Sequence, residues 1–265
     1  MSEIDDTQAP LLEHLIELRK RLVWSILSLL VAFGGCLYFA RGILSFLVAP
    51  LKTAGQARII NTDIFGGFLV EVKVAFFAGL MIAFPIIANQ LWQFVAPGLY
   101  RREKQALLPF LLATPILFIA GASMAYFVAI PVALKFLLGF QGNLGGVEQT
   151  ALPDVNNYLK FIMQFIFGFG ISFLLPVLLM LLEHAGIVTY EQLKGAWRYA
   201  IVASVAIAAV LTPPDVGSQL LLAGPLIGLY FLSLIAIYFT RRRRERTAAT
   251  ETEAADAEAE AQTAE

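Results

Sequence analysis

Long stretches without Asp, Glu, Lys or Arg alternate with short charged segments along this chain. About 20 apolar residues in a helix cross the roughly 30 Å hydrocarbon core of a bilayer. The stretches are continuously apolar, which favours helices over the alternating strands of a membrane barrel. The pattern predicts six transmembrane helices, within Leu22–Ala40, Val74–Tyr100, Gln105–Leu134, Phe161–Leu182, Tyr199–Pro214 and Val216–Thr240.

The fifth stretch is the shortest, and its 16 residues reach only about 24 Å as a helix. Three explanations are open. The membrane is thin at this place, or the hairpin of the fifth and sixth helices does not cross fully, or Arg198 reaches the interface beside an ordinary helix.

Prolines lie inside several of the predicted spans. Each removes a backbone donor and kinks its helix unless neighbouring groups compensate. The sequence therefore predicts an all-α polytopic membrane protein whose six kinked helices form a curved assembly with a concave face. The prolines concerned are Pro85, Pro109, Pro115, Pro176 and Pro225.

Basic residues predict the orientation of the spans. With the N-terminus inside, 13 of the 19 Lys and Arg residues fall in inner segments and six in the longer outer segments. Cytoplasmic segments carry the excess of Lys and Arg, so both termini are expected in the cytoplasm. Asp154 lies in the outer segment 135–159, in the turn signal LPDVNN, and is expected to cap the helix that becomes the fourth span.

Composition agrees with a membrane protein, because 58% of the residues are apolar, 15% are charged and the mean hydropathy is +0.74. The net charge of −1 says nothing about partners, and a lone Cys36 excludes an intramolecular disulfide. The acidic N-terminus lacks the basic region of a cleavable signal peptide, so the first span is expected to be retained.

We expect a transmembrane domain over 1–240 that begins with a short cytoplasmic amphipathic helix. Residues 241–265, basic and then acidic, are expected to form a disordered cytoplasmic tail.

Motifs of catalysis and nucleotide binding are missing from the sequence. There is no phosphate-binding GxxxxGK[ST] loop and no HExxH helix, and His14 and His184 belong to no metal-ligand pattern. We therefore expect no enzyme activity, cofactor, metal or nucleic-acid partner. An ion-coupled small-molecule carrier is the alternative function, although such carriers usually place ionisable residues at mid-membrane. A static scaffold for other membrane subunits is a third class.

Acidic residues at the cytoplasmic ends of the spans raise a question of their own. Glu13 and Glu17 share one helix face, Glu17 and Arg21 are spaced for an i,i+4 ion pair, and Glu103 lies in the short inner segment between spans two and three. A local interpretation is that each carboxylate pairs with a neighbouring Arg. The other is that Glu17 and Glu103 together receive two guanidinium groups of a partner, since Arg presents a planar fork of donors that Lys lacks.

Three motifs resemble one known family. HLIELRKRL before the first span, FVAPGLYRREK between spans two and three, and LTPPDVGSQ between spans five and six are similar to the TatC family of twin-arginine translocase subunits. The resemblance runs from Leu12 to about Tyr238, with the motifs in the same order and topology.

The resemblance implies a receptor in the bacterial cytoplasmic (inner) membrane, with a glove-like fold. It would bind the twin-arginine signal peptides of folded substrates and recruit TatB and TatA into an oligomeric complex driven by the proton motive force. Glu17 and Glu103 would receive the two arginines. The flanking positions that the resemblance implies are Leu18, Arg19, Phe94, Pro97, Leu99 and Tyr100.

Further positions carry implied roles. Pro50 resembles a proline that the family needs for function, and spans five and six resemble the surface on which TatB and TatA dock, with Asp215 and Gln219 at its outer end. Many members carry a glutamate in the fourth span where this sequence has Leu174, so a carboxylate there is not expected. Gln164 is the polar residue nearby.

Overall fold

The computed structural model describes residues 5–56, 58–61, 64–99, 104–144, 147–149, 152–184, 186–212 and 216–263. Side chains are described within 15–242, except for 57, 62–63, 95–110, 142–151, 185 and 213–215. The described chain is nearly all helical, with one short hairpin. Its elements are α1 (Asp5–Tyr38), α2 (Ala40–Thr53), α3 (Gly66–Leu99), α4 (Lys104–Met124), the π-helix η1 (Ala125–Ala129), α5 (Ile130–Leu138), β1 (Gly142–Leu144), β2 (Val147–Gln149), α6 (Val155–Ser172), α7 (Leu175–His184), α8 (Tyr190–Gly195), α9 (Trp197–Leu211) and α10 (Val216–Thr263).

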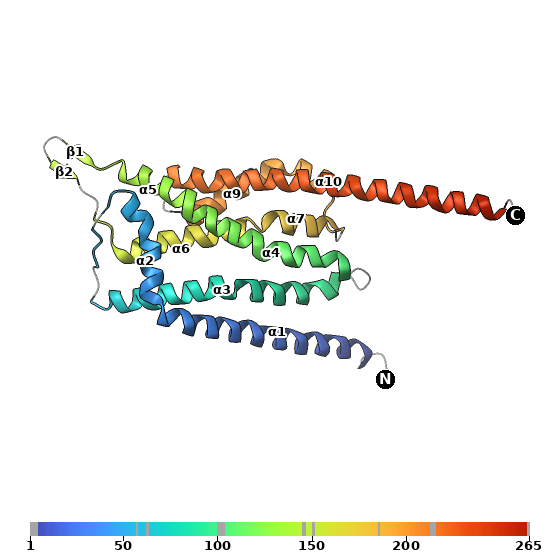
Figure 1. Ribbon diagram of the computed structural model, residues 1–265, viewed down its shortest axis with the longest axis horizontal. Helices are drawn as coiled ribbons and strands as arrows, with labels where there is room; N and C mark the ends of the chain where they lie inside the picture. Colours follow the sequence, from blue (N-terminus) through green and yellow to red (C-terminus); the bar gives the residue numbers. More distant parts are fainter. Residues whose placement is uncertain are drawn as a thin grey trace.

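The long helices run roughly along one direction, and both chain ends point to the same end of the bundle (Figure 1). α2 crosses the opposite end, where the antiparallel β1–β2 hairpin also lies. This arrangement agrees with two termini on one side of a membrane, while the orientation itself stays a prediction.

Five helical segments in the described chain are long and apolar enough to cross a membrane. The fifth predicted span is α9, whose 15 residues reach about 22 Å. The expectation of a short helix there is confirmed, and the total of six spans stays a prediction. The five segments are Leu15–Tyr38, Gly66–Phe94, Leu111–Leu138, Val155–His184 and Val216–Arg242.

Two terminal segments differ from the expected outline. No separate N-terminal helix precedes the first span in the described chain, because α1 is continuous from Asp5 to Tyr38. Where the sequence predicts a disordered tail, α10 continues as a helix to Thr263. Ala, Glu and Arg dominate this segment, and all three are strong helix formers.

Most of the prolines named above lie inside helices that continue through them. α3 continues through Pro85, and α4 through Pro109 and Pro115. The fourth predicted span does break, at Phe173 and Leu174, because Pro176 has no N–H for the Ser172 carbonyl. The expected cap at the other end of this span is confirmed, since the Asp154 carboxylate accepts a hydrogen bond from the Asn157 amide over 3.2 Å.

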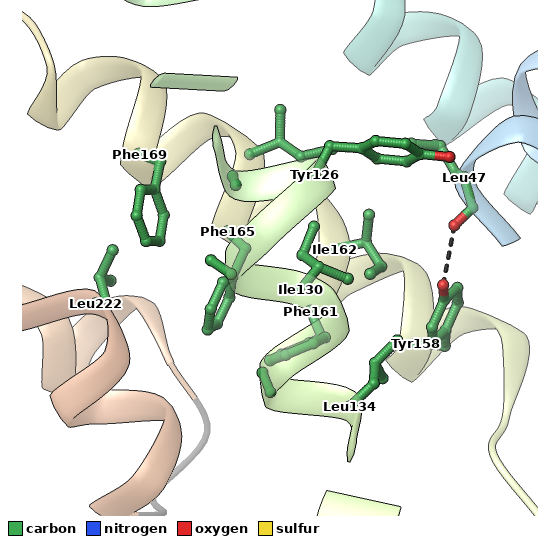
Figure 2. Packing of buried hydrophobic residues seen from close by; sticks show 14 of the residues in the cluster. Leu47, Tyr126, Ile130, Leu134, Tyr158, Phe161, Ile162, Phe165, Phe169 and Leu222 are labelled. Atoms are coloured by element: carbon green, nitrogen blue, oxygen red, sulfur yellow. Dashed lines mark hydrogen bonds between the residues drawn. The ribbon is translucent and has the colours of Figure 1, made fainter. Parts of the chain in front are cut away.

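The core lies where α6 packs against η1, α5 and α10. Phe165, Ile162 and Ile130 are fully buried there, and Leu222 of α10 closes one side (Figure 2). α1 lies apart from this core and packs along α3, where Cys36 and Ala75 are buried.

α2 is fastened across the core by two tyrosines. The Tyr126 hydroxyl of η1 donates to the Phe46 carbonyl over 2.7 Å. The Tyr158 hydroxyl of α6 donates to the Leu47 carbonyl over 2.9 Å (Figure 2). In a regular helix the Phe46 carbonyl would accept from the N–H of residue 50. Pro50 has no N–H, so the tyrosine replaces the missing donor. Pro50, which lies buried inside α2, thus has a structural reason for its place.

We expect Tyr126→Phe to destabilise the protein by about 1–3 kcal/mol, because it leaves the Phe46 carbonyl without a donor. In a Pro50→Ala background the loss should shrink, since an alanine at this position supplies the helical N–H. Thermal unfolding of the four proteins in detergent measures this coupling. Tyr199→Phe, at a tyrosine that is 79% exposed, is the control. Equal losses in both backgrounds would contradict the proposed role of Pro50.

Candidate functional site: the Glu17 cluster

Polar side chains of α1 and α3 meet at the end of the bundle where the chain termini lie. Arg21 donates from Nε to Oε1 of Glu17 over 3.1 Å, and its Nη2 donates to the same oxygen. Its Nη1 donates to Oε1 of Gln93 over 2.8 Å, and Gln93 Nε2 donates to Oδ1 of Asn89 over 2.9 Å. We call Glu17, Arg21, Gln93 and Asn89 the Glu17 cluster.

Helical spacing builds this cluster. Glu17 and Arg21 are one turn apart on α1, as are Asn89 and Gln93 on α3, so each pair shares a helix face. The Arg21 side chain is 18% exposed and that of Glu17 is 36% exposed. Leu18 and Arg19 lie on α1 beside them and are exposed. The carboxylate therefore stands at the rim of the helix pair, within reach of a ligand from solvent.

The local interpretation of Glu17 is confirmed in part, because Glu17 does pair with Arg21. The sequence did not predict the link from Arg21 to Gln93, which joins α1 to the last turns of α3. Asn89 and Gln93, two amides one turn apart in an apolar stretch, were the available signal.

The end of α3 is also tied to α4. Trp92 Nε1 donates to Oγ1 of the buried Thr114 over 3.0 Å, which joins the two helices that flank the inner segment. Phe94 lies next to Gln93 within α3, and the backbone of Pro97 and Leu99 forms the last turn of this helix. The side chains of Pro97 and Leu99, and all of Tyr100 and Glu103, lie outside the described residues. The meeting of Glu17 with Glu103 therefore stays a prediction.

The other predicted positions fall in the part of the chain from α6 to α10. Gln219 lies in the first turn of α10 and donates from Nε2 to the Val205 carbonyl of α9 over 3.3 Å, which ties the two helices together. Asp215 lies outside the described residues. Leu174 is half-buried at the break between α6 and α7, and Gln164 is half-buried on α6.

The chemistry that the Glu17 cluster supports is ionic recognition. Among the described residues, no group of three or more His, Cys, Asp and Glu side chains is placed to hold a metal. In the described part of the chain, Glu17 and Glu71, the carboxylates of the two ion pairs, lie near the first residues of the candidate spans Leu15–Tyr38 and Gly66–Phe94 and not at mid-span. A carboxylate at such a rim binds a guanidinium through charge-assisted hydrogen bonds.

Comparison with known proteins gives one consistent family. Residues 13–225 match the family model described as Sec-independent protein translocase protein (TatC). The chain is 44% identical over 231 residues to the Sec-independent protein translocase protein TatC of Magnetococcus marinus, covering 86% of this chain and 84% of that protein. Identity to the TatC protein of Escherichia coli strain K12 is 39% over 240 residues, with 90% of both chains covered.

Solved structures agree with the sequence relatives. A crystal structure of the twin-arginine translocase receptor TatC superposes with a TM-score of 0.75 at 37% identity, covering 85% of this chain and 98% of that one. A second structure of the same receptor, crystallised in the detergent DDM, gives a TM-score of 0.76 at 38% identity. The fold of this chain is therefore shared over nearly the whole length of those receptors.

Proposed function

This chain belongs to the TatC family of Sec-independent protein translocase proteins, and from that premise we propose that it is the signal-recognition subunit of a twin-arginine export system. It is a multi-pass membrane protein of protein transport. We place it in the bacterial inner membrane with both termini in the cytoplasm. The proposal contains no covalent step.

The observation that carries the proposal is the place of Glu17. Its carboxylate is half-exposed on α1, and its partner Arg21 binds Gln93 in the last turns of α3. The segment that contains Glu103 follows α3 directly in the sequence. Each carboxylate takes one signal arginine, because a guanidinium fork matches a carboxylate and an ammonium does not. The flanking residues Leu18, Arg19 and Phe94 shape the site, together with Pro97, Leu99 and Tyr100.

The apolar part of the signal lies along the concave face of the helices. TatB and TatA dock on the helices of spans five and six, with Asp215 and Gln219 at the outer end of that surface. The bond from Gln219 to Val205 supports this, because it makes α9 and α10 a connected pair. The complex is oligomeric and is driven by the proton motive force.

Binding of a labelled signal peptide to the purified protein in nanodiscs tests the proposal. Peptides with Arg-Arg and with Lys-Lys differ only in the recognised groups. Hydrogen bonds to charged groups contribute about 1.5–3 kcal/mol each. The loss of the fork at one site should therefore weaken binding by about tenfold or more. Equal affinities for the two peptides, or binding that does not depend on Glu17, would refute paired carboxylate recognition.

A further inference from the structure

An arginine of the chain itself, Arg21, binds Oε1 of Glu17. Two nitrogens of the Arg21 guanidinium donate to Oε1 of Glu17, and the third donates to Gln93. Arg21 thus holds the carboxylate with the same fork of donors that a signal arginine would bring. A ligand that approaches Glu17 meets a neutral ion pair, which attracts a cation less than a bare carboxylate does.

The contacts of Arg21 allow it to leave Glu17. A partly exposed i,i+4 pair is a weak interaction, so the pair opens at small cost. Gln93 accepts from Arg21 over 2.8 Å and is itself held by its bond to Asn89. After release from Glu17, Arg21 therefore keeps an acceptor on α3 and does not return to solvent.

We propose that Arg21 is an internal competitor for Glu17, which a signal arginine displaces onto Gln93. The inference rests on the proposed function, because it concerns the same carboxylate. A ligand guanidinium replaces the fork of Arg21 with an equivalent fork. When a ligand ammonium displaces Arg21, Glu17 loses the fork of donors and gains only a point charge in its place. Arg21 thus sets the minimum binding strength that a ligand needs in order to occupy Glu17.

Mass action fixes the expected result of removing the competitor. The apparent affinity of every ligand equals its affinity for the open site multiplied by the fraction of sites in which the Glu17–Arg21 pair is open. Arg21→Gln should therefore tighten binding of the Arg-Arg and the Lys-Lys peptide by the same factor. Since exposed ion pairs contribute up to about 1 kcal/mol, this factor is about two to five. The ratio between the two affinities should stay unchanged.

Lys20→Gln is the matched control, because it removes a neighbouring positive charge from the exposed face of α1. The competitor effect is the increase in peptide affinity caused by Arg21→Gln beyond the increase caused by Lys20→Gln. In a Glu17→Gln background this excess should vanish, since there is no carboxylate left to compete for. The measurement is peptide titration of the full-length protein in nanodiscs, with thermal unfolding recorded for each variant.

The outcomes separate the two proposals. If the wild-type protein binds both peptides equally, or if Glu17→Gln binds as well as the wild-type protein, the proposed function fails and this inference fails with it. If Glu17 matters but Arg21→Gln binds no better than Lys20→Gln, only the competitor is refuted. Weaker binding and a lower melting temperature for Arg21→Gln would also refute the competitor, because Arg21 would then merely hold Glu17 and α3 in place.

Discussion

Replacing both Glu17 and Glu103 by glutamine should abolish export of twin-arginine substrates. Glutamine keeps the size of each side chain, and at position 17 it can still accept from Arg21, so the fold should persist. Each lost carboxylate–guanidinium contact costs about 1.5–3 kcal/mol. Two such losses lower signal affinity by about 10²–10⁴-fold. Export of a reporter substrate in cells that lack their own TatC measures the effect.

The control for this experiment removes two other carboxylates. Glu71 pairs with Arg41 beyond the opposite end of α1, and Glu191 lies in the first turn of α8. Glu71→Gln with Glu191→Gln changes the net charge by the same amount and should export at the wild-type level. Equal export by the two double variants would show that Glu17 and Glu103 merely solvate helix ends.

Replacing Gly79 by leucine should separate α1 from α3. A Cβ added at Gly79 would lie 2.8 Å from both N and Cα of Phe33, so the backbone of α1 stands where a side chain would begin. Overpacking at a close contact costs about 1–3 kcal/mol and moves the backbone. Because the α1–α3 contact brings Arg21 to Gln93, the Glu17 cluster should open as well. We expect a lower melting temperature in detergent and weaker binding of the signal peptide.

Gly34 supplies the comparison, because it lies on α1 one residue from Phe33 and an added Cβ there meets no atom within 4 Å. Gly34→Leu adds the same apolar bulk to the same helix pair without a clash. Its melting temperature should match that of the wild-type protein. If Gly79→Leu were as stable as Gly34→Leu, the close approach of the two helices would not be what positions α1.

The hydrophobic pattern predicted the five long spans, but it did not predict where all of their helices begin. The second stretch was predicted to begin at Val74, yet α3 begins at Gly66. Glu71 and Lys73 ended the apolar stretch, but charged side chains remain in a helix that extends beyond the hydrocarbon. These two residues instead bind across to Arg41 and Asn156 at the outer end.

The outer helix α2 was missed although its signal was present. Leu44, Leu47 and Leu51 recur at helical spacing, and Leu47 and Leu51 are buried against the core. Arg41 and Lys52 enclose this segment, so a search for membrane spans treats it as a loop. A proline at position 50 also argues against a helix. The hydroxyl that replaces the missing donor belongs to Tyr126, which is 80 positions from Phe46 in sequence.

For the Glu17 cluster, the local part was predictable and the tertiary part was not. The i,i+4 spacing of Glu17 and Arg21 predicted their ion pair. The bond between Arg21 and Gln93 joins residues 72 positions apart. It depends on how α1 packs along α3, which the close approach at Gly79 allows and no local pattern indicates.

Site-specific photocrosslinking from positions 17 and 103 in native membranes tests the central claim most directly. The photoreactive residue replaces one carboxylate at a time, so that the other stays in place, and each variant is offered a signal peptide with Arg-Arg and then the same peptide with Lys-Lys. The account predicts crosslinks from both positions that weaken together with Lys-Lys. Equal crosslinks with the two peptides, or crosslinks from neither position, would contradict paired recognition by Glu17 and Glu103.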